Sequence, residues 1–178
     1  MAMSEAFSAH TATLLAQAEA TCDARGAKLT ELRREVLGLI LDAPGPTGAY
    51  DLLDRLRARR GTAAPPTVYR ALDFLQEQGL VHRIQSLAAF VGCVEEHGHR
   101  HAAQFLICRG CGQVTEIEDH ELAHALAAAA ARVGFAVAEA TIEAVGVCRA
   151  CQKEGRRGAA PEPAQIPNSG GRVAGPHR

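Results

Sequence analysis

Two pairs of cysteines limit the folds that are open to this chain. The first pair is Cys108-x-x-Cys111 and the second is Cys148-x-x-Cys151, with 36 residues between them. Each Cys-x-x-Cys turn places two sulfur atoms on one side, so the two pairs together offer the four thiolates of a tetrahedral zinc site. Such a site has no open position for a substrate. We therefore predict a structural zinc ion that joins the start of a small unit to its end.

A redox-active Cys-x-x-Cys is the other interpretation of such a pair. The N-terminus shows no apolar signal segment, and no stretch approaches the roughly 18 apolar residues of a membrane span, which predicts a cytoplasmic protein with reduced thiols. Six cysteines in that compartment favour metal or redox chemistry over structural disulfides. Because there are two pairs, zinc is favoured and the chain is predicted not to be an enzyme. A redox enzyme stays open as a rival that would show thiol–disulfide turnover.

The first half of the chain has the periodicity of helices. Thr30 is placed to cap one helix, which ends at the turn Pro44-Gly45-Pro46. Another helix is predicted to end at Gly61, and the prolines of 65–66 stand in the first turn of a later helix that runs to Gly79. After Gly79 apolar and polar residues alternate, which predicts a two-stranded ribbon. Helices followed by such a ribbon form a winged helix.

A second, smaller unit is predicted downstream. Strands at 105–108 and 114–117 flank the first cysteine turn, a helix follows, and a third strand region at 135–147 leads to the second pair. Residues near the end are rich in Pro, Gly and Arg and lack periodicity. The predicted fold class is therefore α+β, in three parts: a winged helix over residues 1–87, a small α/β unit over 88–152 and a disordered tail over 153–178.

A second set of candidate metal ligands consists of His82, Cys93, His101 and Glu116. Taken singly, each has an ordinary interpretation: a satisfied strand histidine, a small buried thiol or a solvated carboxylate. Taken together they connect the two units, because His82 lies on the ribbon and Glu116 on a strand of the second unit. One thiolate, two imidazoles and one carboxylate suit tetrahedral Zn²⁺. With zinc this set is neutral whereas four thiolates leave −2, so we predict a weaker, exchangeable site suited to a sensor.

Four further histidines between residues 97 and 124 belong to neither set. They could form a third, weak metal site, but solvated surface histidines are the favoured interpretation because single imidazoles are common on surfaces. They are His97, His99, His120 and His124.

The helix over 65–79 has one apolar face and one polar face. Its apolar face carries Val68, Ala71, Leu72 and Leu75, so Thr67, Tyr69 and Arg70 point outward as candidate DNA contacts. An arginine can bind guanine through two hydrogen bonds, and a tyrosine can reach a phosphate. A surface arginine beside a half-buried tyrosine is the alternative. Nine cations against five anions between residues 25 and 70 are compatible with a polyanionic partner.

Four segments together resemble the Fur family of metal-dependent repressors, with the zinc uptake regulators as the most similar branch. They are "AYDLLDRLR", "PPTVYRALDFLQEQGLVHRI", "FLICRGCG" and "IEAVGVCRAC", and the resemblance covers roughly residues 10–152. It implies a DNA-binding domain over 1–87 and a dimerisation and metal-binding domain over 88–152. It also implies a homodimer, two Zn²⁺ per subunit, and repression of zinc-uptake genes at AT-rich inverted repeats in double-stranded DNA.

The resemblance also assigns residues. It places the regulatory zinc on His82, Cys93, His101 and Glu116, and the structural zinc on Cys108, Cys111, Cys148 and Cys151. It places DNA contacts on Tyr50 and Arg70, with Tyr69 nearby. Asp54 and Arg57 match positions where family members pair two dimers on one operator.

One departure from the family pattern bears on the metal. The run His97-Gly-His-Arg-His101 differs from the His-His-Asp-His-like run of the iron-sensing branch, and together with Cys93 it favours zinc. A Fur-type repressor that senses iron, manganese or nickel stays the alternative. A metal-storage protein is a more distant rival, because it would leave the outward Tyr69 and Arg70 unexplained.

Overall fold

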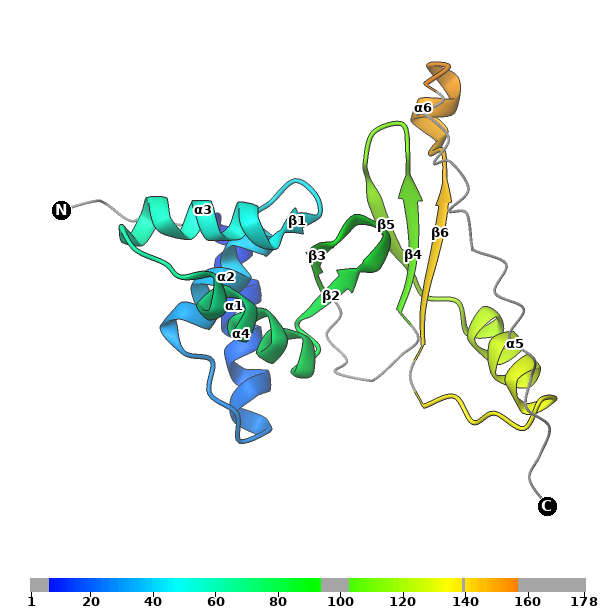
Figure 1. Ribbon diagram of the computed structural model, residues 1–178, viewed down its shortest axis with the longest axis horizontal. Coiled ribbons are helices and arrows are strands. Elements are labelled where there is room, and N and C mark those ends of the chain that lie inside the picture. The colour runs from blue at the N-terminus through cyan, green and yellow to red at the C-terminus, as the bar shows by residue number, and fades with distance from the viewer. Residues whose placement is uncertain (1–6, 94–102, 139, 157–178) are drawn as a thin grey trace.

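The computed structural model describes residues 7–93, 103–138 and 140–156. A group of helices lies at one side of the molecule and a three-stranded sheet at the other, with a small ribbon between them (Figure 1). The helices on the first side are α1 (Ala9–Ala24), α2 (Glu31–Leu41), α3 (Ala49–Arg60) and α4 (Pro65–Glu77).

The ends of these helices follow the predicted signals. The Thr30 hydroxyl accepts the backbone N–H of Arg33 at 3.5 Å and so caps α2. Gly61, with a φ of 75°, ends α3 in the left-handed region that favours glycine. Pro65 stands in the first turn of α4, where its missing N–H costs no hydrogen bond. The predicted helices are therefore confirmed.

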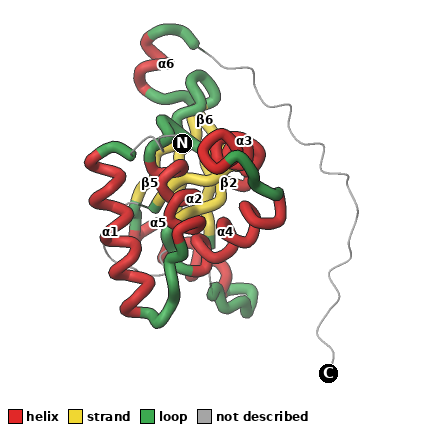
Figure 2. Tube along the Cα trace, turned by 90° about the vertical axis from the view of Figure 1, so that its left-hand side faces the viewer, coloured by secondary structure: helices red, strands yellow, loops and turns green. Residues whose placement is uncertain are grey.

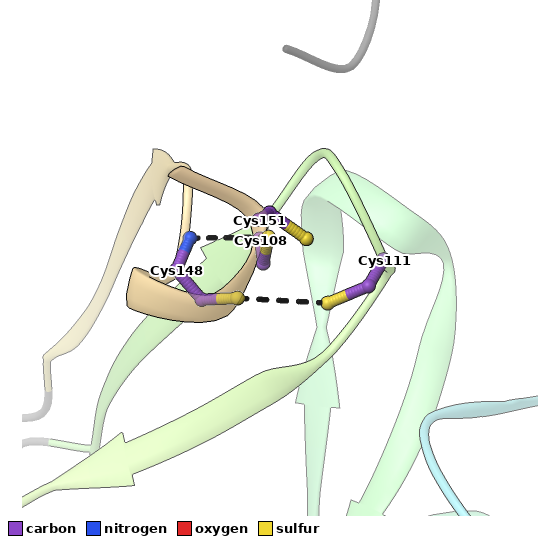
Figure 3. A group of neighbouring side chains, drawn as sticks. All are labelled: Cys108, Cys111, Cys148 and Cys151. Carbon is purple, nitrogen blue, oxygen red and sulfur yellow. Dashed lines mark hydrogen bonds between the residues drawn. The ribbon is translucent and has the colours of Figure 1, made fainter. Parts of the chain in front are cut away.

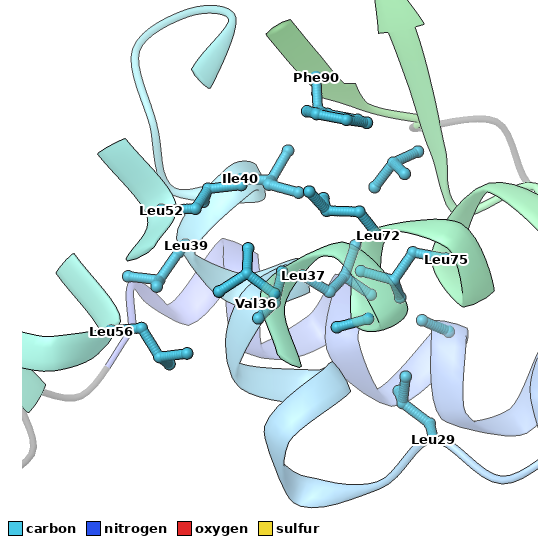
Figure 4. Close-up of a cluster of buried hydrophobic side chains, with 14 of the residues drawn as sticks. Leu29, Val36, Leu37, Leu39, Ile40, Leu52, Leu56, Leu72, Leu75 and Phe90 are labelled. Atoms are coloured by element: carbon cyan, nitrogen blue, oxygen red, sulfur yellow. The ribbon is translucent and has the colours of Figure 1, made fainter. Parts of the chain in front are cut away.

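The apolar faces of the helices form the main hydrophobic core (Figure 4). Leu37 of α2 and Leu72 of α4 are each 1% exposed, and α2 packs against both α3 and α4. Full burial of one leucine side chain contributes about 1.5–3 kcal/mol. This core holds the outward face of α4 in place.

Leu72→Ala is expected to lower the free energy of unfolding by about 2–5 kcal/mol, because it removes buried methyl groups and leaves a cavity. Leu87→Ala is the matched control, since Leu87 is 43% exposed, and it should change stability by about 0.5 kcal/mol or less. Urea denaturation of both variants at saturating zinc measures the difference. Equal losses would contradict this description of the core.

A small antiparallel sheet follows the helices. Its strands are β1 (Thr47–Gly48), β3 (Ala89–Gly92) and β2 (Val81–Ile84), in that order, and the short 3₁₀ helix η1 (Gln85–Leu87) closes the turn from β2 to β3. The predicted ribbon is confirmed as β2 and β3. The sequence did not indicate β1 or η1, since two or three residues carry no periodicity. Helices and ribbon together form the winged helix.

The second sheet has the order β5-β4-β6. β4 (Ala103–Cys108) pairs antiparallel with β5 (Val114–Ile117) and parallel with β6 (Thr141–Gly146), and α5 (His120–Ala131) lies in the connection from β5 to β6. The predicted strand region at 135–147 is shorter in the structure, where, among its described residues, 141–146 form the strand. Exposed Phe135 and Val137 precede it. A short helix after β6, α6 (Arg149–Lys153), was not predicted.

Strand β2 touches both hydrophobic cores. Val81 belongs to the helical core, whereas Ile84 packs with Phe105 and Ile107 of the second sheet. Alternate residues of a strand point to opposite faces, so His82 shares the face of Ile84 and points toward the second sheet. The ribbon therefore joins the two halves.

The predicted tail falls almost wholly on 157–178, outside the described residues, and it stays a prediction together with the boundary between residues 87 and 88. Among the described residues, no helix is long and apolar enough to span a bilayer.

Candidate metal centres

The two cysteine pairs meet at one end of the second sheet (Figure 3). Their four sulfur atoms all lie within 4.8 Å of one another, and the Sγ atoms of Cys111 and Cys148 are 3.8 Å apart. A tetrahedral zinc with bonds of about 2.3 Å places its sulfurs about 3.8 Å apart. The residues present therefore fit a closed zinc site. They are Cys108, Cys111, Cys148 and Cys151.

Backbone hydrogen bonds prepare one of these thiols for metal binding. The N–H of Cys148 donates to the Sγ atom of Cys108 at 3.2 Å. This bond, with others from Cys111 and Gly110, lowers the pKa of the Cys108 thiol to about 6. Burial and the neighbouring thiols raise the pKa of Cys151 to about 12. A bound cation reverses that effect, because a coordinating thiol loses its proton.

Two glycines shape the first cysteine turn. A Cβ atom at Gly110 would lie 3.0 Å from the Sγ atom of Cys151 and 3.0 Å from the carbonyl oxygen of Arg156, so a larger residue would push α6 away. Gly112 has a φ of 74°, in the left-handed region. The turn can therefore approach α6 closely enough for the sulfurs to meet.

A second group of metal-ligating atoms lies between the ribbon and the second sheet. One ligand atom each from His82, Cys93 and Glu116 lies within 4.8 Å of the others, and Nε2 of His82 is 3.4 Å from Oε1 of Glu116. All three residues are half-buried. Nitrogen, sulfur and oxygen donors together suit borderline-soft Zn²⁺. The fourth predicted ligand, His101, lies outside the described residues.

The fold explains why these three residues meet. His82 is on β2, and the backbone N–H of Cys93, directly after β3, donates to the carbonyl of Leu80 at 3.0 Å. Glu116 is on β5, paired with Phe105 of the central strand. The His82 ring packs edge-on against Phe105, with ring centroids 5.5 Å apart. The group therefore draws ligands from both halves of the molecule.

A further contact between the halves was missed by the sequence reasoning. The carboxylate of Glu143 on β6 accepts the backbone N–H of Gln85 at 2.6 Å and that of Ser86 at 3.0 Å. Burial raises the pKa of the Glu143 carboxyl, but the hydrogen bonds from Ser86 and Gln85 outweigh burial and leave the pKa below its ordinary value. The sequence signal that could have indicated this contact is a charged residue within the largely apolar strand Thr141–Gly146.

Of the four histidines between residues 97 and 124 outside the two ligand sets, the two that lie among the described residues are not part of a metal site. His120 lies 3.7 Å from Glu118, and His124 is exposed on α5. Neither belongs to a metal-ligating group among the described residues. His97 and His99 lie outside the described part of the chain.

The candidate DNA contacts lie on α3 and α4, which pack against one another on the side of the molecule seen in Figure 2. Tyr50, in the first turn of α3, is 72% exposed, and Tyr69 of α4 is 44% exposed. Arg70 is exposed and Thr67 half-buried. All four side chains are therefore at or near the surface of one pair of helices.

The two residues predicted to pair dimers also lie on α3. Asp54 and Arg57 are both exposed, and within one chain their side chains form an ion pair at 3.5 Å. Arg57 also donates to the carbonyl of Ala63 at 3.1 Å.

Comparison with known proteins agrees with this geometry. The chain is 47% identical over 146 residues to the zinc uptake regulation protein of Escherichia coli (strain K12), a match that covers 79% of this chain and 82% of that protein. It is 33% identical over 132 residues to the zinc uptake regulation protein of Mycobacterium tuberculosis (strain ATCC 25618 / H37Rv), covering 72% and 98%.

A structural neighbour and a family model extend the comparison. A solved structure of a zinc uptake regulator complexed with zinc and DNA has a TM-score of 0.79 and 43% identity, and the match covers 83% of this chain and 99% of that chain. Residues 24–145 match the model of the ferric uptake regulator family. The chain belongs to the ferric uptake regulator family.

Proposed function

We propose that this protein is a zinc-responsive transcriptional repressor, which binds operator DNA as a homodimer and represses zinc-uptake genes. The observation that carries the proposal is the meeting of His82 on the ribbon and Cys93 directly after the ribbon with Glu116 from the second sheet, within 4.8 Å. The names of the relatives and the solved regulator bound to zinc and DNA support it.

The three ligands act by restricting the orientation of the winged helix relative to the second sheet. Zinc bound there supplies a positive centre that holds donors from both halves at bonding distance. A winged helix free to turn relative to its partner seldom places both recognition helices in successive major grooves. His82, Cys93 and Glu116 thus favour the orientation that fits DNA, which is a shift of population. A shift from 1:99 to 99:1 needs about 5.5 kcal/mol of differential affinity.

The four cysteines have a separate, structural role in this proposal. They join the first strand of the second unit to α6, and with the regulatory site they give two zinc ions per subunit. The closed set of thiolates suits a tightly held ion, whereas the mixed set suits an exchangeable one. The winged helix, which includes β3 up to Gly92, acts as the DNA-binding domain, and the second sheet with α5 and α6 acts as the dimerisation domain.

An uncovered apolar surface supports the homodimer. No residue of α5 is buried within the single chain. Leu122 and Leu126 of α5 are exposed, and so is Phe135, which follows α5. Leu106 of β4 is also exposed. Large exposed apolar side chains are common where proteins contact one another. A second copy of the chain would cover them. On operators that hold two dimers, Asp54 and Arg57 would exchange partners between dimers, and such exposed pairs are individually weak.

Arg70→Ala is expected to weaken operator binding by about 30-fold or more, because the homodimer loses two contacts to guanine, one in each half-site, and each costs about 1–3 kcal/mol. Zinc content and thermal stability should not change, since Arg70 is exposed. Arg149→Ala removes an equal charge from an exposed position on α6, away from α3 and α4, and serves as the control. Fluorescence anisotropy at fixed salt measures both variants. Equal affinity of Arg70→Ala and wild type would remove Arg70 from the DNA interface.

The proposal is tested by titrating operator binding with different metals. Purified protein carrying only its structural zinc is mixed with DNA containing an AT-rich inverted repeat, and Zn²⁺, Fe²⁺ or Mn²⁺ is added. We expect a shift of the DNA band with zinc at the lowest free concentration. A response to iron or manganese in preference to zinc would identify a different sensor of the same family. Zinc binding without any operator binding would indicate a storage protein.

A further inference from the structure

We propose that Glu143 is a second anchor between the winged helix and the second sheet, one that uses no metal and sets how much zinc the sensor needs. This inference rests on the proposed function and names a positioning residue for it. It starts from the two hydrogen bonds that the Glu143 carboxylate accepts from the tip of the ribbon, at 2.6 Å from Gln85 and 3.0 Å from Ser86.

The register of the second sheet puts this anchor in line with the metal site. Phe105 of the central strand pairs with Glu116 on one side and with Glu143 on the other. Directly paired residues on neighbouring strands point to the same face. Strands lie about 4.8 Å apart, so Glu116 and Glu143 are separated by about 10 Å along this row.

Strand β2 and η1 of the winged helix follow this row from one end to the other. His82 meets Glu116 and the Phe105 ring. Ile84, two residues on, packs in the same cluster as Phe105. The backbone of Gln85 and Ser86 then meets Glu143. The winged helix therefore touches the sheet at a metal-ligating end, an apolar centre and a hydrogen-bonded end.

The hydrogen bonds to Glu143 limit a rotation of the winged helix against the second sheet that the metal ligands alone would still allow. Ligands gathered at one point hold that point but allow a rigid body to pivot about it. A contact about 10 Å away along the row opposes this rotation effectively, because it acts far from the metal site. Hydrogen bonds to an ionised carboxylate are stronger than those to neutral groups.

The Glu143 contacts also raise the apparent affinity of the sensor site for zinc. The ligands from the two halves meet only in the closed orientation, so the apparent dissociation constant for zinc rises as the closed fraction falls. Loss of the Glu143 contacts lowers that fraction. Glu143 should therefore tune zinc sensitivity without touching the ion.

The variants Glu143→Ala and Glu143→Gln test this inference against Glu19→Ala. Glu19 lies on α1 in an exposed ion pair with Arg34 at 3.9 Å, far from the row, and its loss removes the same charge. Glu143→Gln keeps one acceptor oxygen, so it should fall between Glu143→Ala and wild type. All variants are used as full-length chains that carry structural zinc.

Two measurements are made. Amide hydrogen exchange, resolved by residue with NMR, should show faster exchange at Gln85 and Ser86 by about tenfold in Glu143→Ala. Competition with a chromophoric zinc chelator should show weaker binding of the second zinc by about tenfold, with no loss of the first. Glu19→Ala should match wild type in both.

Unchanged exchange at Gln85 and Ser86, or unchanged affinity for the second zinc, would overturn the inference. So would loss of the structural zinc or a collapse of thermal stability in both Glu143 variants, since Glu143 would then serve the fold alone. If wild type showed no zinc-dependent operator binding while Glu143→Ala still showed both effects, the anchor would stand and the proposed repressor function would fall.

Discussion

Cys108→Ser is expected to remove one zinc ion per chain and to unfold the second sheet at ordinary temperature. The reason is the small size of the apolar core there, whose buried residues are Ile84, Ala103, Phe105 and Ile107. Units with so little core depend on metals or disulfides for their stability. Binding of a structural zinc contributes about 10–16 kcal/mol in small zinc domains at neutral pH. Serine does not replace the thiolate that the Cys148 N–H stabilises.

Elemental analysis, circular dichroism and size-exclusion chromatography measure this effect. Cys108→Ser should show one zinc fewer, a lower Tm and loss of the dimer. Cys22→Ala is the control, because Cys22 is buried in the helical core and lies in neither metal-ligating group. It should keep full zinc content. Normal zinc content and a normal dimer in Cys108→Ser would show that the four cysteines do not hold a structural ion.

Cys93→Ser is expected to abolish the zinc response while leaving the fold intact. Removal of one donor from a mixed site weakens zinc binding strongly, because Glu116 and His82 alone offer one oxygen and one nitrogen among the described ligands. The closed orientation then loses its stabilisation. We expect operator affinity at saturating zinc to fall by about 100-fold, near the upper end of usual coupling between two sites.

The measurement is a zinc titration of operator binding, followed by elemental analysis of the protein. Cys93→Ser should retain the structural zinc and the dimer, which separates it from Cys108→Ser. Cys22→Ala again controls for the loss of a thiol and should respond to zinc like wild type. Operator binding by Cys93→Ser that equals wild type at saturating zinc would show that the assigned sensor is wrong.

Much of the architecture could be predicted because its signals are local. Thr30, Pro65 and Gly61 mark helix ends through short-range chemistry, and the structure places those ends as expected. The two Cys-x-x-Cys turns predict their own meeting, because four thiols in one small unit have a strong common partner in zinc. The joint placement of His82, Cys93 and Glu116 was also predicted, and the structure brings these three together.

The remaining features depend on contacts that no local pattern records. β1 is two residues long and exists because Thr47 pairs with Phe90, 43 positions later. The strand after Gly134 is shorter than expected because residues 135–138 lie outside the sheet. Glu143 meets Gln85 only after β6 has paired with β4 in one register. Tertiary pairing decides all three, so composition and periodicity could not predict them.

The central claim is that a zinc ion joins the winged helix to the second sheet. Its most direct test is anomalous diffraction at the zinc absorption edge, on crystals of the zinc-loaded protein. Two peaks per chain are expected. One should lie among the four sulfurs of the cysteine pairs, and the other about 2.0–2.3 Å from donor atoms of His82, Cys93 and Glu116. A second peak on other residues, or none at all while the crystals contain excess zinc, would contradict the claim that an ion joins the winged helix to the second sheet.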